Sequence, residues 1–196
     1  MVGLRERGSM YTSADLRKGL KIEIEGVPYV ITEFNFVKPG KGQAVYNCKL
    51  RNLVTGSTMT RAYRSNDRMD EPRLEERSLR YSYLDGDHIV FIDENYEQVN
   101  IQTDVFGDKL RFLVADMEVT VLFHNGRPIE TTLPYFVEKK IIHAEPGARG
   151  DTATNVTKAA RIEGDYEIQV PLFVNQGDVV RIDTRTGEYV DRVAKK

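Results

Sequence analysis

The chain has 196 residues and a mass of 22.4 kDa, long enough for one large domain or for two or three small ones. It is 40% hydrophobic and 30% charged, which suits a globular protein and excludes a disordered or collagen-like chain. No apolar run approaches the 18 or so residues of a membrane-spanning helix, and the single cysteine, Cys48, excludes an internal disulfide.

The net charge of −2 hides an uneven distribution of charge along the chain. Residues 1–73 hold 13 Lys and Arg against 8 Asp and Glu, residues 74–137 hold 5 against 12, and residues 138–196 hold 10 against 10. No acidic residue occurs between Glu33 and Asp67, a stretch that contains the basic residues Lys38, Lys41, Lys49, Arg51, Arg61 and Arg64. A field of one sign is typical of a nucleic-acid footprint, although an ordinary solvated face also fits.

The expected elements, in chain order, are mostly short strands. A single helical turn is expected after a capping box at Thr12–Asp15, and residues 20–25 alternate apolar and charged side chains with the period of a half-buried strand. Further strands are expected over residues 27–31, 46–54, 58–63, 79–83, 88–92, 119–123, 167–174, 179–183 and 188–193, with one short helix around 107–116. Asp85-Gly86 and Asn125-Gly126 favour type I′ hairpin turns. The pattern predicts an all-β protein built from small barrels.

Composition also suggests where the domains end. The polar stretch 65–73 is predicted to be a strand-poor linker, and it coincides with the change from basic to acidic sequence. A second junction is expected near residues 134–137. The predicted organisation is therefore an N-terminal extension or residues added for expression (1–9), a basic domain (10–73), an acidic central domain (74–137) and a C-terminal domain (138–196).

The segment over residues 36–45 lies between two apolar runs and is predicted to be a hairpin tip. Pro39 would stiffen it, while Gly40 and Gly42 flank Lys41 and permit unusual backbone angles. Lys41 would then stand at an apex. The spacing does not match a Walker loop, and a solvent-exposed turn lysine without a role fits the pattern equally well.

No residue pattern indicates catalysis or metal binding. The acidic pairs Glu75/Glu76 and Asp85/Asp87 have the spacing of solvated side chains, and no GxSxG nucleophile elbow is present. No two of the three histidines have metal-ligand spacing. The sequence therefore predicts a protein that is not an enzyme, with no metal and no bound cofactor. The first ten residues lack an apolar signal core, so we expect a cytoplasmic protein with no membrane partner.

Four segments resemble bacterial elongation factor P, in the same order along the chain. They read DLRKGLKI (residues 15–22), FVKPGKGQA (36–44), PGARGDT (146–152) and VPLFVNQGDVVRIDTRTGEYVDR (170–192). The resemblance implies a KOW or SH3-like barrel over 10–73 and two OB-folds over 74–137 and 138–196, in an L shape that mimics tRNA. It further implies a monomeric translation elongation factor that binds both ribosomal subunits between the peptidyl and exit sites, stimulates peptide bond formation and relieves stalling at consecutive prolines.

The resemblance also implies roles for particular residues. Lys41 would reach the acceptor end of the P-site peptidyl-tRNA, after extension by a lysine-modifying enzyme, for example with a β-lysyl group. The loop residues that support it would be Lys38, Pro39, Gly40 and Gly42, and the exit-site codon loop would be Gly150, Asp151 and Thr152. The charge pattern adds an RNA-binding basic patch of Lys49, Arg51, Arg61 and Arg64. A stand-alone OB-fold protein that binds single-stranded nucleic acid is the alternative function.

Overall fold

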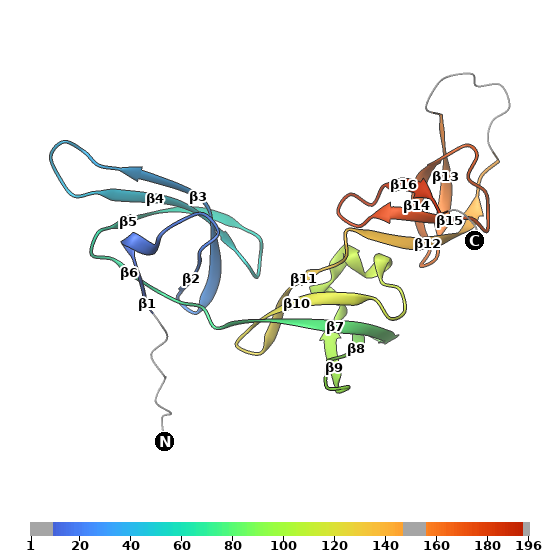
Figure 1. Cartoon of the computed structure of the whole chain (residues 1–196), viewed down its shortest axis with the longest axis horizontal. Coiled ribbons are helices and arrows are strands. Elements are labelled where there is room, and N and C mark those ends of the chain that lie inside the picture. The colour runs from blue at the N-terminus through green and yellow to red at the C-terminus, as the bar shows by residue number, and fades with distance from the viewer. Residues whose placement is uncertain (1–9, 147–155, 194–196) are drawn as a thin grey trace. The chain divides into compact units, whose positions relative to one another are not determined.

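The computed structural model describes residues 10–146 and 156–193, and almost all of its regular structure is β-strand (Figure 1). The all-β expectation is therefore confirmed. The predicted extension over residues 1–9 and the predicted codon loop at Gly150, Asp151 and Thr152 lie outside the described residues. The chain divides into two compact units, one of residues 1–77 with 121–130 and one of residues 78–120 with 131–196.

The first unit contains a six-stranded antiparallel sheet in the order β1-β6-β2-β3-β4-β5. Its strands are β1 (Met10–Thr12), β2 (Lys21–Ile24), β3 (Val27–Val37), β4 (Val45–Asn52), β5 (Thr58–Arg64) and β6 (Arg68–Asp70). Alternate residues of these strands face one core, whose buried members are Leu16, Leu20, Ile22, Ile31, Cys48, Leu50, Tyr63 and Met69. Burial raises the pKa of the Cys48 thiol, as befits a core residue.

The stretch 65–73, which was predicted to be a strand-poor linker, contains one short strand of the first sheet. Strand β6 lies within it and joins both β1, where Met10 is opposite Asp70, and β2, where Glu23 is opposite Asp70. Met69, the apolar residue of β6, is buried in the core. The sequence did not indicate β6 because one apolar residue gives no detectable period, whereas the pairing joins segments that lie far apart in the sequence.

Residues 74–132 form a second sheet in the order β11-β10-β7-β8-β9. Its strands are β7 (Leu74–Asp85), β8 (His88–Ile92), β9 (Gln98–Gln102), β10 (Glu118–His124) and β11 (Arg127–Thr132). The helix expected around 107–116 is present as the 3₁₀ helix η3 (Gly107–Phe112), and a second 3₁₀ helix, η2 (Thr103–Val105), precedes it. Its position is confirmed, but it is shorter and more tightly wound than an α-helix.

The third sheet has the order β14-β13-β12-β15-β16 and lies in the second unit. Its strands are β12 (Phe136–Ala144), β13 (Thr157–Ile162), β14 (Tyr166–Pro171), β15 (Val179–Asp183) and β16 (Tyr189–Arg192). Helix η3 packs against this barrel within the unit. The Arg111 guanidinium lies 3.9 Å from the Tyr166 ring centroid, and Nζ of the buried Lys139 donates to the Leu113 carbonyl at 2.8 Å.

The two hairpin turns that were predicted as type I′ differ from one another. Asn125 and Gly126 have φ values of 50° and 78°, as a type I′ turn requires. Asp85 instead remains in β7, opposite His88, so the turn is Gly86-Asp87. Gly86 has φ 59° and Asp87 is not among the positive-φ residues, which is the sign pattern of a type II′ turn. The type I′ prediction was wrong there because the glycine occupies the first turn position.

Candidate functional site

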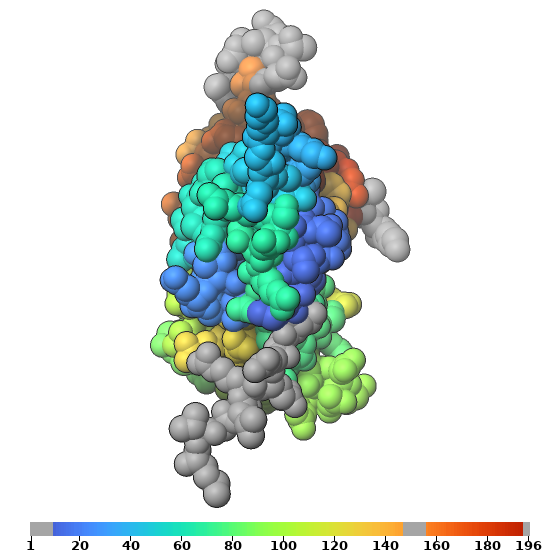
Figure 2. Space-filling view, turned by 90° about the vertical axis from the view of Figure 1, so that its left-hand side faces the viewer, coloured from blue at the N-terminus to red at the C-terminus, as the bar shows by residue number. Residues whose placement is uncertain are grey.

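The hairpin of β3 and β4 carries the lysine that the sequence singled out. Its strands pair from Tyr29 opposite Asn52 to Val37 opposite Val45 and leave residues 38–44 as the connecting loop. Ile31 and Leu50 are fully buried, whereas residues 33–37 of β3 are exposed, so the hairpin continues past the core of its barrel. Figure 1 and Figure 2 show this loop standing out from the first unit. The predicted hairpin tip is confirmed.

Lys41 lies within this loop, and its side chain is free. Residues 38–43 are all exposed, and Lys41 makes no ion pair or hydrogen bond within residues 10–146 and 156–193. Gly42 has φ +123°, a conformation that favours glycine, and a Cβ there would lie 3.6 Å from Pro39 Cγ. Gly40 does not have a positive φ. The loop therefore depends on Gly42 next to Lys41, because its backbone conformation favours glycine.

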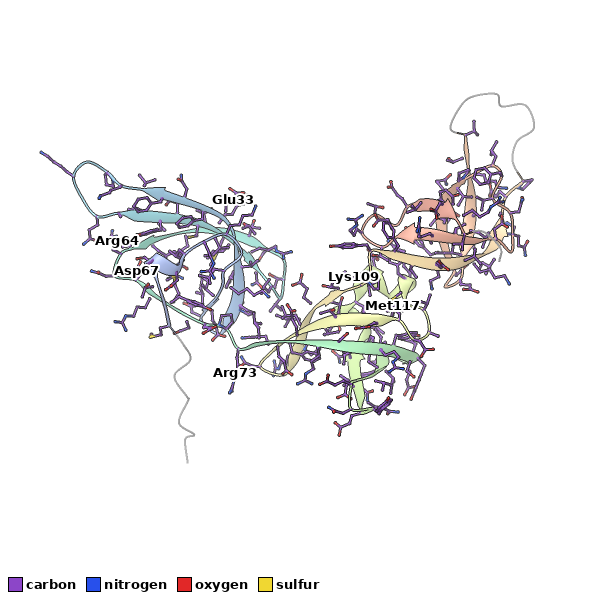
Figure 3. All side chains as sticks on the ribbon, viewed as in Figure 1. Glu33, Arg64, Asp67, Arg73, Lys109 and Met117 are labelled. Carbon is purple, nitrogen blue, oxygen red and sulfur yellow. The ribbon has the colours of Figure 1, made fainter. Side chains whose placement is uncertain are left out.

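The four residues of the predicted basic patch do not form one uniform surface. Lys49 pairs with Glu33 at 2.9 Å and Arg51 approaches Glu130 at 3.9 Å, so their charges are partly neutralised. Glu33, Arg64 and Asp67 are labelled in Figure 3.

Strand register divides the patch between the two faces of the sheet. Arg61 is opposite Cys48 and therefore shares its face, whereas Lys49, Arg51 and Arg64 occupy the other face. Arg61 and Arg64 make no ion pair among the described residues. The Arg61 guanidinium lies 5.4 Å from the Tyr63 ring centroid.

The charge pattern gave no hint of the aromatic residues on the same hairpin. Phe34 and Phe36 are exposed, and both contact Tyr46 with ring centroids 6.0 Å and 5.0 Å apart. Alternating aromatic residues at positions 34 and 36 are the sequence signal that could have revealed them. All three rings share the face of Cys48 and Arg61, because Phe34 is opposite Cys48 and Phe36 is opposite Tyr46.

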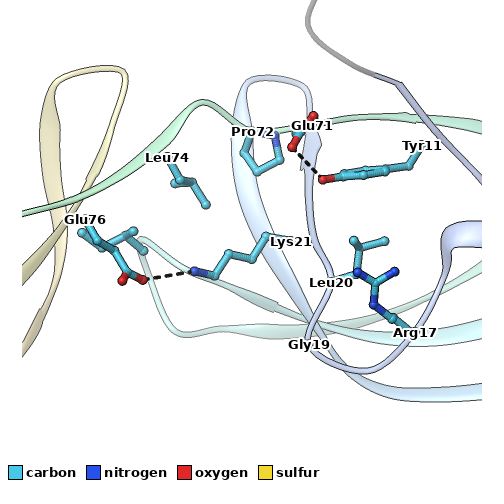
Figure 4. A pocket seen from close by; sticks show the side chains of 10 residues that line it. Tyr11, Arg17, Gly19, Leu20, Lys21, Glu71, Pro72, Leu74 and Glu76 are labelled. Atoms are coloured by element: carbon cyan, nitrogen blue, oxygen red, sulfur yellow. Dashed lines mark hydrogen bonds and ion pairs between the residues drawn. The ribbon is translucent and has the colours of Figure 1, made fainter.

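A pocket of about 360 Å³ in the first unit offers a second candidate site (Figure 4). Lys21 Nζ lies 3.7 Å from a Glu76 oxygen, and the Tyr11 hydroxyl donates to Glu71 at 2.8 Å. Burial and this hydrogen bond raise the pKa of the Tyr11 phenol above its usual range. The lining residues include no histidine, cysteine or serine. Four polar side chains of the pocket are thus engaged with one another in these two pairs.

The acidic pairs considered in the sequence have ordinary surface environments. Glu75 accepts hydrogen bonds from the Arg77 guanidinium, which lowers the pKa of that carboxyl. Asp87 lies 2.6 Å from Nδ1 of His88; the Asp87 side chain is largely exposed and that of His88 is partly exposed. No group of three metal-ligating side chains occurs among the described residues, and no helix among them is long and apolar enough to cross a membrane.

Comparison with known proteins identifies the family. Three family models match in order: the KOW-like domain of elongation factor P at residues 12–69, its OB domain at 74–131 and its C-terminal domain at 137–192. Elongation factor P of Desulfotalea psychrophila is 49% identical over 185 residues, covering 94% of this chain and 99% of the relative. Elongation factor P of Desulforapulum autotrophicum is 50% identical over the same length, with the same coverage of both chains.

Two solved structures share the fold at lower identity. The translation initiation factor 5A from Methanococcus jannaschii has a TM-score of 0.55 at 20% identity, covering 68% of this chain and 98% of its own. A translation initiation factor 5A family protein from Naegleria fowleri has a TM-score of 0.51 at 19% identity, covering 65% of this chain and 99% of its own. A translation factor is favoured over a stand-alone nucleic-acid-binding module. Three family models match in order, and two named relatives are about half identical over almost the whole chain. The chain belongs to the elongation factor P family of translation factors.

Proposed function

We propose that the chain binds the ribosome between the peptidyl and exit sites, in contact with both subunits, and that Lys41 reaches the acceptor end of the P-site peptidyl-tRNA. The observation that carries this proposal is the hairpin of β3 and β4, which extends past its barrel core and presents an exposed Lys41 without a partner among the described residues. A free cation on a narrow, projecting hairpin suits a confined polyanionic site. Membership of the elongation factor P family supplies the ribosome as the partner.

The proposed mechanism is positioning. Contacts with phosphates and sugars fix the register of a nucleic acid, so a cationic arm at the tRNA end orders the peptidyl substrate. Peptide transfer between two tethered reactants is sensitive to orientation, and ordering a slow prolyl substrate lowers the barrier to bond formation. Stalling at consecutive prolines is thereby relieved. The protein assists the reaction of the ribosome and catalyses no reaction of its own.

Lys41 also has the environment that a modification site needs. Its neighbours Lys38, Pro39, Gly40 and Gly42 are exposed, so a modifying enzyme can approach the amine from several sides. Extension by a β-lysyl group would lengthen the arm and add a further amine. Intact-mass measurement of protein from its own host tests this point, since an unmodified mass would exclude an added group.

The proposed position on the ribosome also implies RNA contacts for other residues. The unpaired Arg61 and Arg64 would contact RNA phosphates more strongly than Lys49 and Arg51, whose charges are engaged by Glu33 and Glu130. We further propose that Gly150, Asp151 and Thr152 contact the exit-site codon, as the family resemblance implies. We propose that the protein acts as a monomer in the cytoplasm, where the ribosomes are.

Reconstituted translation of a template with consecutive proline codons tests the proposal. Lys41→Ala should abolish most of the rescue while changing the free energy of unfolding by about 0.5 kcal/mol or less, because the side chain is exposed. Lys41→Arg keeps the charge but removes the amine that would be modified, and it should fail almost as badly. Lys18→Ala, at an exposed lysine outside the hairpin, is the matched control. Full rescue by Lys41→Ala would disprove the role of this residue.

A further inference from the structure

The aromatic face of the β3–β4 hairpin has no role in the mechanism described above. Phe34 and Phe36 are 37% and 47% exposed, although both belong to the sheet face that is buried lower in the barrel at Cys48 and Leu50. Tyr46 lies between them and continues to Tyr63, its partner on β5. The aromatic face, defined as Phe34, Phe36 and Tyr46, is thus an uncovered continuation of the core face.

Three cations beside this face make no ion pair with the described residues. Arg61 shares the face and lies over the Tyr63 ring, and it has no acidic partner among the described residues. The loop at the end of the hairpin adds Lys38 and Lys41, which likewise make no ion pair with described residues. The opposite face differs, because Lys49 there pairs with Glu33.

Solvent-exposed aromatic rings beside cations that make no ion pair are a combination that binds unpaired nucleotides. Bases stack on aromatic rings and on arginine planes, while cations contact the phosphates. A duplex hides its base faces, and a protein-docking site would not require the unpaired cations that adjoin these rings. The charge complementarity therefore favours a single-stranded polyanion as the occupant.

We propose that the aromatic face is a stacking site for unpaired RNA bases, with Arg61, Lys38 and Lys41 contacting the adjoining phosphates. The identity of this RNA rests on the proposed function: it is the unpaired end of the P-site tRNA. Phe36 is five residues from Lys41 in the sequence, a reach of at most about 18 Å. One RNA end can thus contact both the stacking site and the lysine.

The absence of tryptophan from the chain allows a direct test of stacking. Phe36→Trp in the full chain places a single fluorescent indole on the aromatic face and retains an aromatic ring there. A single-stranded RNA hexanucleotide should quench its emission, whereas the same sequence in a duplex should quench it far less. No quenching by the single strand, or equal quenching by both RNAs, would overturn the proposal.

Leucine substitutions separate stacking from apolar contact. Phe36→Leu and Tyr46→Leu keep an apolar side chain but remove the ring, so affinity for the hexanucleotide should fall at least about fivefold for each ring lost. Phe36→Tyr keeps the ring and should bind like the parent chain, and thermal unfolding of each variant confirms that it is folded. Leucine variants that bind the hexanucleotide normally would overturn the proposal. Should those variants lose only Lys41 modification, the face would dock a protein instead.

The two proposals can fail separately. Lys41→Ala combined with Phe36→Trp should still show quenching by the hexanucleotide, at a higher RNA concentration, because one phosphate contact is lost while the stacking ring remains. Loss of rescue in Lys41→Ala therefore tests the translation mechanism, and loss of RNA affinity in Phe36→Leu tests the stacking site. Retained rescue in Lys41→Ala, together with normal quenching, would disprove the mechanism and leave the stacking site standing.

Discussion

Gly187 lies in the signature segment DTRTGEY, and its substitution should destabilise the second unit. The residue is buried with φ +78°, in the region that L side chains rarely adopt. A Cβ at this position would lie 3.4 Å from the Tyr166 hydroxyl and 3.5 Å from an Arg111 nitrogen. These two side chains form the stacked pair that joins helix η3 to the C-terminal barrel. Gly187→Ala therefore affects both the backbone and this contact.

The magnitude follows from these two contributions. An alanine held in the left-handed region costs about 1–2 kcal/mol relative to glycine. Displacing the Arg111 guanidinium from the Tyr166 ring lowers the free energy of unfolding by a further contribution of about 0.5–1 kcal/mol. We therefore expect Gly187→Ala to lower the free energy of unfolding by about 1.5–3 kcal/mol. Urea denaturation followed by circular dichroism measures this loss.

Gly177→Ala is the matched control, because Gly177 lies in the same barrel with φ +89° and nothing within 4 Å of its Cβ position. It should lose only the backbone contribution of about 1–2 kcal/mol. In an Arg111→Ala background the difference between the two glycine variants should disappear. If the two glycine variants lose equal free energy of unfolding in the parent background, crowding of Arg111 by the new Cβ contributes nothing to the effect of Gly187→Ala. No loss in either variant would refute the backbone contribution.

Two further predictions concern charge. Hydrogen bonds from Arg185 hold the pKa of Asp183 at about 2, below the 3.8 of the unfolded chain, so stability from this pair is present above pH 4 and lost as the pH falls toward 2. The stability of Asp183→Asn should therefore lack this loss between pH 4 and pH 2. An acid-unfolding profile equal to that of the parent chain would contradict the assignment of the loss to Asp183. Arg64→Gln should weaken ribosome binding and reduce the slope of log affinity against log salt by about one, whereas Arg51→Gln, whose charge faces Glu130, should change it less. Equal slopes for the two variants would show that ion pairing does not govern these contacts.

Local patterns in the sequence were sufficient for the all-β class and for the apex hairpin. Strands β8 and β15 have the expected bounds, because each is a short apolar run closed by a glycine turn. The tip around Lys41 was also predictable, since Pro39 and Gly42 restrict or free the backbone through their own covalent geometry. The division into domains at residues 73 and 137 remains a sequence prediction.

Tertiary pairing decided what the local patterns could not. The register between β3, β4 and β5 placed Arg61 on the aromatic face and Lys49 on the other, and it brought Glu33 to Lys49. Strand β6 exists because β1 and β2 lie beside it, although its own residues show no period. A charge list gives the sign of a surface, but neutralisation depends on distances between segments that are remote in the chain. The sequence by itself therefore determined the position of Lys41, while only the tertiary structure decided which of its cationic neighbours are free.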